Sequence, residues 1–300
     1  MQIFQDGSYT FDMIAFFLGA MAGFLSGLLG VGGGFLITPG LNLMGLPMPM
    51  AVGTSLAQMV GASFSGCVRH GLNRNIRYDL SLLLGAPLLI GVYLGRDLMV
   101  YLAGAGLSED VPRGLFIVVL FCMGFTMLFK GSTIKNPSKT SSPKSPVFLL
   151  KGVLLFLITL TIGLLSGLLG MGGGFFMVPI LTYIFCVRQA VASGSSLFAV
   201  FFGSLVGALA YAKASLVDVR LCFVLMAGSV AGAYLGAMLA DRVDGARLKK
   251  LFSVLVLVAA FSMLLRQFGV KEEAFYLLFS SAFLLSVFSI GSVYAARRAL

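Results

Sequence analysis

Two runs of three glycines are the residues in this sequence with the clearest potential for binding chemistry. Each run follows a stretch reading LSGLLG, and the members are Gly32, Gly33 and Gly34 in one half and Gly172, Gly173 and Gly174 in the other. Consecutive glycines interrupt a helix and leave free backbone N–H groups at the start of the next one. Such N–H groups favour a negative charge, so the runs indicate an anion site; close helix packing is the alternative.

Small polar side chains recur near both runs. Hydroxyls near a helix start can cap the helix and can also donate to an oxyanion, and we expect both roles here. The amide of Gln58 has Ala199 at the equivalent place in the second half, which favours an asymmetric substrate. The candidate binding side chains are Ser26, Thr54, Ser55, Gln58, Ser166, Ser195 and Ser196.

The remaining titratable groups are few. His70 is the one histidine, and beside Arg69 it could gate a pathway or relay protons, although an interfacial histidine is the simpler interpretation. All acidic residues fall at segment ends or in loops, where they form no cation site within a membrane. The four cysteines lack metal-type spacing. The sequence therefore predicts neither a metal nor a cofactor.

The composition defines the elements that must position these groups. Hydrophobic residues make up 59% of the chain and charged residues 11%, and the mean hydropathy is +1.01. A soluble domain carries about 25% charged residues. We therefore predict an all-α polytopic membrane protein, with basic loops that reflect topology and not nucleic-acid binding. The expected segments are 12–31, 33–46, 48–69, 79–101, 113–130, 148–169, 172–187, 190–212, 218–240, 247–266 and 274–296.

An internal duplication organises these segments. GFLSGLLGVGGGFLITPGL at 23–41 matches GLLSGLLGMGGGFFMVPIL at 163–181, and GTSL at 53–56 matches GSSL at 194–197. We predict a first transmembrane repeat over 1–130, a cytoplasmic polar linker over 131–147, a second repeat over 148–266 and an added C-terminal helix over 267–300. The short segments 33–46 and 172–187 either span fully or are half-helices and re-entrant.

Five segments per half is an odd number, so the two repeats should be inverted relative to each other in the membrane. Placing the loop that holds Arg74 and Arg77 in the cytoplasm puts most of the 21 Lys and Arg residues on that side. This predicts an outside N-terminus and a cytoplasmic C-terminus.

The paired LSGLLGxGGGF motifs, the GTSL and GSSL starts and the H-x-x-x-x-x-I sequence from His70 resemble the sulfite exporter TauE/SafE family, also called the 4-toluene sulfonate uptake permease family. The resemblance implies a multi-pass protein of the cell membrane, in bacteria the inner membrane, that moves sulfur-containing anions. It also implies roles for the glycine runs, Gly53 to Ser55 with Gly194 to Ser196, Pro39, Pro179 and His70. Tyr211 replaces histidine in the second half.

From the residues and the resemblance together we expect a secondary transporter that moves a sulfite-, sulfonate- or sulfoacetate-like anion by alternating access, in the direction of export. The alternatives are an anion channel and, with His70 as a base, an intramembrane hydrolase. The expected partners are the small anion and the lipid bilayer. A homodimer and the identity of a coupling ion are left open.

Overall fold

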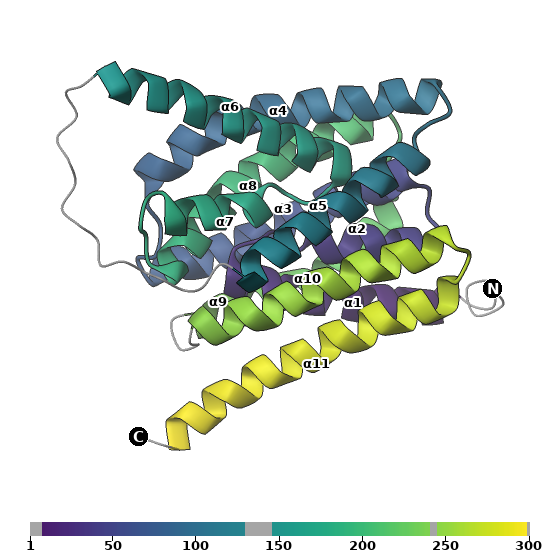
Figure 1. Ribbon diagram of the computed structural model, residues 1–300. Helices are drawn as coiled ribbons and strands as arrows, with labels where there is room; N and C mark the ends of the chain where they lie inside the picture. Colours follow the sequence, from purple (N-terminus) through teal and green to yellow (C-terminus); the bar gives the residue numbers. More distant parts are fainter. Residues whose placement is uncertain (1–7, 130–145, 241–244, 299–300) are drawn as a thin grey trace.

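The computed structural model describes residues 8–129, 146–240 and 245–298, and these residues are helical with short connections and no strand. The helices in these ranges are α1 (Ser8–Leu29), α2 (Gly34–Leu43), α3 (Met48–Leu72), α4 (Tyr78–Gly104), α5 (Asp110–Phe129), α6 (Pro146–Leu169), α7 (Gly174–Tyr183), α8 (Gln189–Lys213), α9 (Val219–Leu239), α10 (Gly245–Gln267) and α11 (Lys271–Arg298) (Figure 1). The all-α prediction is confirmed. The predicted linker over 131–147 lies outside the described residues except where α6 begins.

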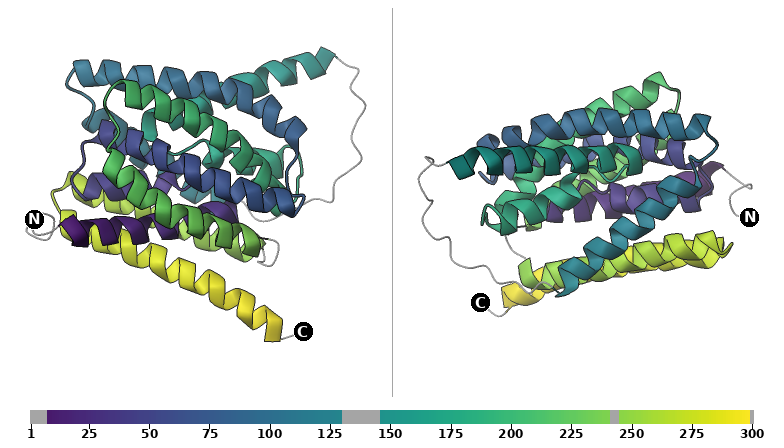
Figure 2. Two further views of the ribbon diagram at one scale, coloured as in Figure 1. Left: turned by 180° about the vertical axis from the view of Figure 1, so that it is seen from behind. Right: turned by 45° about the horizontal axis from the view of Figure 1, so that its top comes forward.

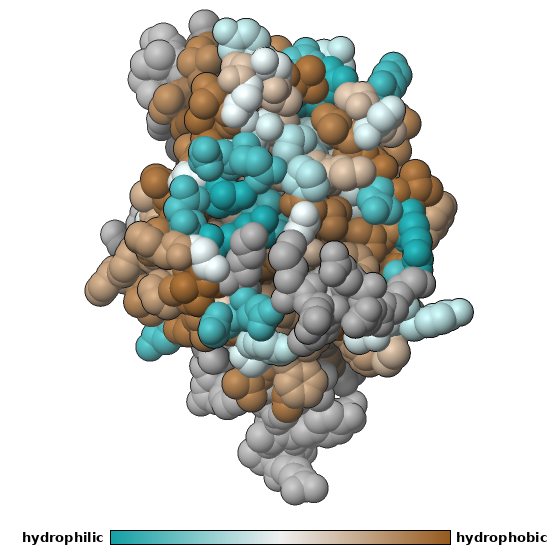
Figure 3. Space-filling view, turned by 90° about the vertical axis from the view of Figure 1, so that its right-hand side faces the viewer, coloured by the Kyte–Doolittle hydropathy of each residue, from teal (hydrophilic) through white to brown (hydrophobic). Residues whose placement is uncertain are grey.

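Six of the described helices are long and apolar enough to cross a membrane, namely α1, α4, α5, α6, α8 and α9. Large apolar side chains such as Phe129 and Phe223 are exposed, as lipid-facing residues are. Figure 3 looks onto one end of the molecule, where hydrophilic side chains gather between more apolar edges. The chain is therefore a multi-pass membrane protein.

The helices α2 and α7 have 10 residues each. At 1.5 Å per residue each is about 15 Å long, half of a typical hydrocarbon core. Neither can span the bilayer alone. Of the two alternatives for these segments, the length excludes a full span.

The first helix of each half packs against the fourth helix of the other half. In the pair α1 and α9, a methyl group on Gly23 would overlap the backbone of Ser229, and one on Gly27 would overlap Ala233. The residue numbers rise together, so the two helices run parallel at backbone contact. The pair α6 and α4 has equivalent contacts, made by Gly91, Gly95, Gly163 and Gly167. Figure 2 shows both pairs from a second side.

The third helices of the two halves, α3 and α8, pack along each other in opposite directions. After the end of α3, the backbone N–H of Arg77 donates to Ser195 Oγ near the start of α8 (2.9 Å). After the end of α8, the N–H of Asp218 donates to Thr54 Oγ1 near the start of α3 (2.9 Å). These two equivalent helices thus run antiparallel, and α1 begins at the end of the bundle opposite to where α11 ends (Figure 1).

An aromatic cluster packs at the first turns of the two short helices, α2 and α7. Phe35 and Phe175, which each follow the glycine run of their half, stack at 5.9 Å between ring centroids. Phe252 of α10 meets both rings edge-on, at 5.1 Å and 5.9 Å. All three side chains are fully buried, so α2 and α7 are held side by side at their first turns.

Candidate functional site

The breaks between α1 and α2 and between α6 and α7 meet at the centre of the bundle. A Cβ atom placed on Gly32 would lie 3.8 Å from the Cα of Gly172. Both residues have positive φ values, +89° and +78°, a conformation that side-chain-bearing residues rarely adopt. The two glycine runs therefore form one central feature, and glycine is required there by backbone conformation.

Met59 of α3 and Val200 of α8 close this centre from either side. The Cβ position on Gly32 lies 3.0 Å from Val200 Cγ1 and 3.2 Å from Met59 Sδ. Met59 and Val200 occupy equivalent places in the duplicated sequence. In this conformation the centre is packed by side chains of both third helices.

Each half reaches across to the other half's break with a serine hydroxyl. Ser55 Oγ donates to the carbonyl oxygen of Gly170 (3.2 Å), and Ser196 Oγ donates to that of Gly30 (2.7 Å). Thr38 Oγ1 also donates to Gly170 (3.2 Å). In this conformation the hydroxyls of Ser55 and Ser196 satisfy carbonyl groups that the broken helices leave without a partner.

The expected helix-capping role of these hydroxyls is wrong. Pro47 and Arg188 precede α3 and α8 without a side-chain capping bond, and Thr54 and Ser195 lie inside the helices. Their hydroxyl oxygens instead accept the backbone N–H groups of Asp218 and Arg77 described above. The sequence could not show this because the acceptors and donors belong to different halves.

Two of the predicted binding side chains are fully buried with polar atoms that no described residue satisfies. Both amide atoms of Gln58, Nε2 and Oε1, and the hydroxyl Oγ of Ser26 are in this state. A buried donor or acceptor without a partner costs about 1–3 kcal/mol. Gln58 directly precedes Met59 on α3, and Met59 contacts the breaks. These atoms are the strongest candidates for ligand contacts. Ser166, the counterpart of Ser26, is also buried.

Ser193 belongs to the same group, although the sequence did not single it out. Its Oγ is buried without a partner among the described residues, and its Cβ lies 2.8 Å from a Cβ placed on Gly30. Its counterpart in the first half is Val52. The signal available in the sequence was a serine directly before the GSSL stretch, at a place where the first half has an apolar residue.

His70, in the last turn of α3, is fully buried within the protein. Its Nε2 lies 2.9 Å from the carbonyl oxygen of Gly27 on α1. The hydroxyl of Tyr211 donates to the carbonyl oxygen of Gly167 on α6 (2.8 Å). Gly27 and Gly167 are equivalent, so the histidine and the tyrosine hold their halves' first helices in the same way.

Arg69, predicted to act with His70, packs elsewhere. Its guanidinium carbon lies 5.6 Å from the ring centroid of Tyr234 on α9, a cation–π contact. Among the residues that the structure describes, no group of three or more His, Cys, Asp or Glu side chains could hold a metal ion.

Broken helices that meet inside a bundle of membrane-spanning helices are a feature of membrane transporters. The chain belongs to the sulfite exporter TauE/SafE family, whose model matches residues 15–154 and again 154–296. The resemblance of the motifs to this family is thereby confirmed.

The relatives are named as membrane transporters. A probable membrane transporter protein of Xylella fastidiosa is 27% identical over 255 residues, which cover 84% of this chain and 94% of the relative. One of Haemophilus influenzae is 29% identical over 213 residues, 66% of this chain and 72% of the relative. The probable membrane transporter protein YdhB of Bacillus subtilis is 27% identical over 228 residues, 75% and 87% of the two chains. No solved structure matches the chain.

Proposed function

We propose that this protein is a secondary transporter that carries a small sulfur-containing anion, such as sulfite, a sulfonate or sulfoacetate, outward across the membrane. The observation that carries the proposal is the meeting of the two glycine breaks against Met59, together with the buried, unsatisfied amide of Gln58, the residue before it on α3. The family description as sulfite exporters supports the substrate class.

The proposed binding groups are those that the protein itself leaves unused. Gln58 offers an amide donor and an acceptor, and Ser26 and Ser193 offer hydroxyls. Such neutral donors can hold an oxyanion without a buried counter-charge. An amide that both donates and accepts fits an anion with a protonated oxygen, such as hydrogen sulfite, as well as a bare oxyanion.

Alternating access is the proposed mechanism, and the antiparallel course of α3 and α8 supports it. Inverted repeats exchange conformations when one half adopts the arrangement of the other. The centre around Met59 and Val200 is packed in this conformation, which favours a carrier over an open anion channel. We propose no catalytic role for His70, because its Nε2 is engaged by the carbonyl group of Gly27.

Export is the proposed direction because of the membrane potential. An inside-negative potential of 100 mV favours exit of each negative charge by about 2.3 kcal/mol. Outward flux of an anion therefore needs no coupling ion. The proposed orientation has the N-terminus outside and the C-terminus in the cytoplasm.

Flux into proteoliposomes tests the proposal. The purified protein is reconstituted, an inside-positive potassium-diffusion potential is imposed, and uptake of radiolabelled sulfite is followed with protein-free vesicles as the control. We expect saturable uptake that grows with the potential. Equal uptake in both kinds of vesicle, for sulfite and for a sulfonate, would reject transport of these substrates, and flux without saturation would favour the channel.

A further inference from the structure

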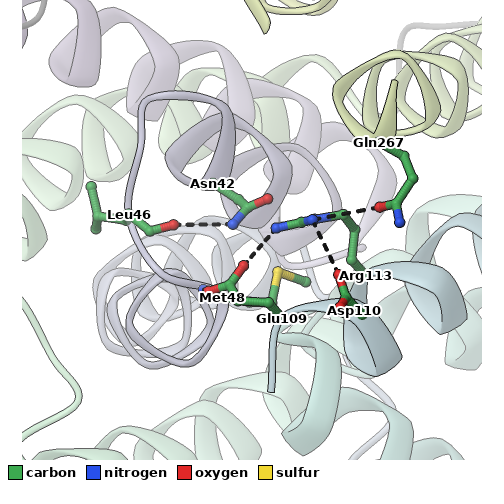
Figure 4. A network of polar contacts seen from close by, with 7 residues as sticks. All are labelled: Asn42, Leu46, Met48, Glu109, Asp110, Arg113 and Gln267. Atoms are coloured by element: carbon green, nitrogen blue, oxygen red, sulfur yellow. Dashed lines mark hydrogen bonds and ion pairs between the residues drawn. The ribbon is translucent and has the colours of Figure 1, made fainter. Parts of the chain in front are cut away.

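A second polar cluster lies away from the glycine centre, where three connections meet at one end of the bundle. It joins the last turn of α2, the start of α5 and the last turn of α10 (Figure 4). We name it the arginine cluster, and its members are Asn42, Glu109, Asp110, Arg113, Arg266 and Gln267.

Each oxygen of the Glu109 carboxylate already has a partner. Glu109 Oε1 accepts the backbone N–H of Met48 at the start of α3 (2.6 Å), and its Oε2 pairs with Arg113 Nη2. The carboxylate of Asp110 lies 3.8 Å from Arg113, and its side chain is 74% exposed, so water screens that contact. Glu109 therefore neutralises one guanidinium and fixes the start of α3.

The cluster holds a second guanidinium. Arg266 is half-buried in the last turn of α10, directly before Gln267, whose Oε1 faces Arg113. Arg266 Nη1 and Arg113 Nε are buried N–H donors without a partner among the described residues. Arg113 Nη1 makes only a long contact with Gln267 Oε1 (3.5 Å). Within the part of the chain that the structure describes, the unpartnered buried atoms of the cluster are thus these two guanidinium donors and one amide oxygen, Asn42 Oδ1, and leaving charged donors unpaired is costly.

We propose that the arginine cluster binds a small oxyanion, with Arg113 Nε and Arg266 Nη1 as its donors. Guanidinium groups bind carboxylate, sulfate and phosphate oxygens through paired N–H groups at fixed spacing. An anion between the two arginines satisfies both donors and removes the repulsion between the two positive charges. The donors are buried, so the ligand must be compact.

The position of the cluster relates it to the glycine centre. Asn42, in the last turn of α2, donates through Nδ2 to Leu46 (3.0 Å) on the connection that leads to Met48. The other end of α2 is Gly34, so one half-helix of about 15 Å separates the two places. An anion held there would stand at one mouth of the proposed pathway. Binding at the cluster does not depend on transport, so the inference goes beyond the proposed function.

A local fluorescent reporter tests the proposal. The sequence contains no tryptophan, and Phe268, two residues after Arg266, is 76% exposed. The Phe268→Trp protein, in nanodiscs of neutral phosphatidylcholine, therefore carries one indole beside the cluster. We expect sodium sulfate to change its emission saturably, at constant ionic strength set with a bulky organic salt.

Two variants on the Phe268→Trp background assign the signal. Arg266→Gln keeps a polar side chain but removes the charge, and it should raise the dissociation constant for sulfate at least tenfold. Arg220→Gln is the matched control, because Arg220 is 59% exposed and pairs with Asp12; its constant should stay within twofold. No saturable signal in the parent, or an equal constant for Arg266→Gln, would overturn the proposal.

A lipid phosphate could satisfy the same donors as a free small anion. Changing the lipid composition of the nanodiscs distinguishes these two ligands. In nanodiscs containing phosphatidylglycerol, sulfate should still saturate the signal, with at most a modest change in its constant. A signal that phosphatidylglycerol produces and that sulfate neither produces nor displaces would overturn the small-anion assignment. The outcome is independent of sulfite flux in proteoliposomes, so failure here and failure of the transport proposal are distinguishable.

Discussion

The hydroxyl of Ser196 donates to the carbonyl oxygen of Gly30 over 2.7 Å, and this bond joins the two halves at the point where the first helix breaks. The reciprocal bond from Ser55 to Gly170 is longer, at 3.2 Å, and Gly170 also receives Thr38. The same kind of serine-to-carbonyl hydrogen bond therefore joins the two halves at both breaks, but only the carbonyl of Gly170 has a second side-chain donor.

Replacing Ser196 should cost more stability than replacing Ser55. In Ser196→Ala the carbonyl of Gly30 loses its side-chain donor, which we expect to lower the free energy of unfolding by about 1–3 kcal/mol. In Ser55→Ala, Thr38 still donates to Gly170, so the loss should be about 1 kcal/mol or less. Thermal unfolding in detergent compares the two, and the reverse order would contradict the assigned contacts.

Glycine is required at the centre for its backbone conformation. In Gly32→Ala the new methyl group would combine a φ of +89° with a 3.0 Å approach to Val200, and we expect a loss of at least roughly 1–2 kcal/mol. Gly114→Ala on α5 is the control, since nothing lies within 4 Å of its Cβ position and alanine favours a helix by up to about 1 kcal/mol. Equal melting temperatures for the two variants would show that the break is not constrained.

Replacing Gln58 with an apolar residue should raise the stability of the protein and lower its transport activity. Gln58→Leu keeps the volume and removes two unsatisfied buried atoms, so we expect stability to rise by about 1 kcal/mol while sulfite flux falls at least tenfold. Ser63→Ala is the control on the same helix, because Ser63 Oγ bonds to the carbonyl of Met59 within α3. Flux at the parent rate in Gln58→Leu would remove Gln58 from the binding site.

His70 and Tyr211 should behave as structural equivalents. His70→Phe and Tyr211→Phe each remove one bond to a glycine carbonyl and should each lower the free energy of unfolding by about 0.5–1.5 kcal/mol. The pH profile of sulfite flux should be the same in His70→Phe as in the parent protein. A profile that flattens in His70→Phe alone would restore the proton-relay interpretation.

The helices and the two breaks could be predicted because their signals are local. Apolar runs of about 20 residues mark spans, and glycine runs interrupt them at any depth. The α2 and α7 half-helices, ten residues each, follow from the same pattern. The internal duplication also showed which positions of the two halves correspond, for example Ser55 and Ser196.

The partners of the polar side chains could not be predicted, because they lie in the other half or in distant connections. Equivalence shows that Thr54 corresponds to Ser195, but not that Asp218 and Arg77 donate to them. His70 lies at the end of an apolar segment beside an arginine, and its burial against α1 and α8 depends on contacts between distant helices. The arginine cluster could not be predicted because Arg113 and Arg266 are separated in the sequence by the linker and by α6, α7, α8 and α9.

The glycine-to-backbone contacts of α1 with α9 and of α6 with α4 have a consequence for ancestry. The first helix of each half packs on the fourth helix of the other half, so neither half can make these contacts by itself. A single ancestral half could have built this arrangement only as two separate polypeptides inserted in opposite orientations. Fusion of the duplicated genes then guarantees one copy in each orientation, and thereafter the two copies were free to diverge, as Gln58 and Ala199 have done.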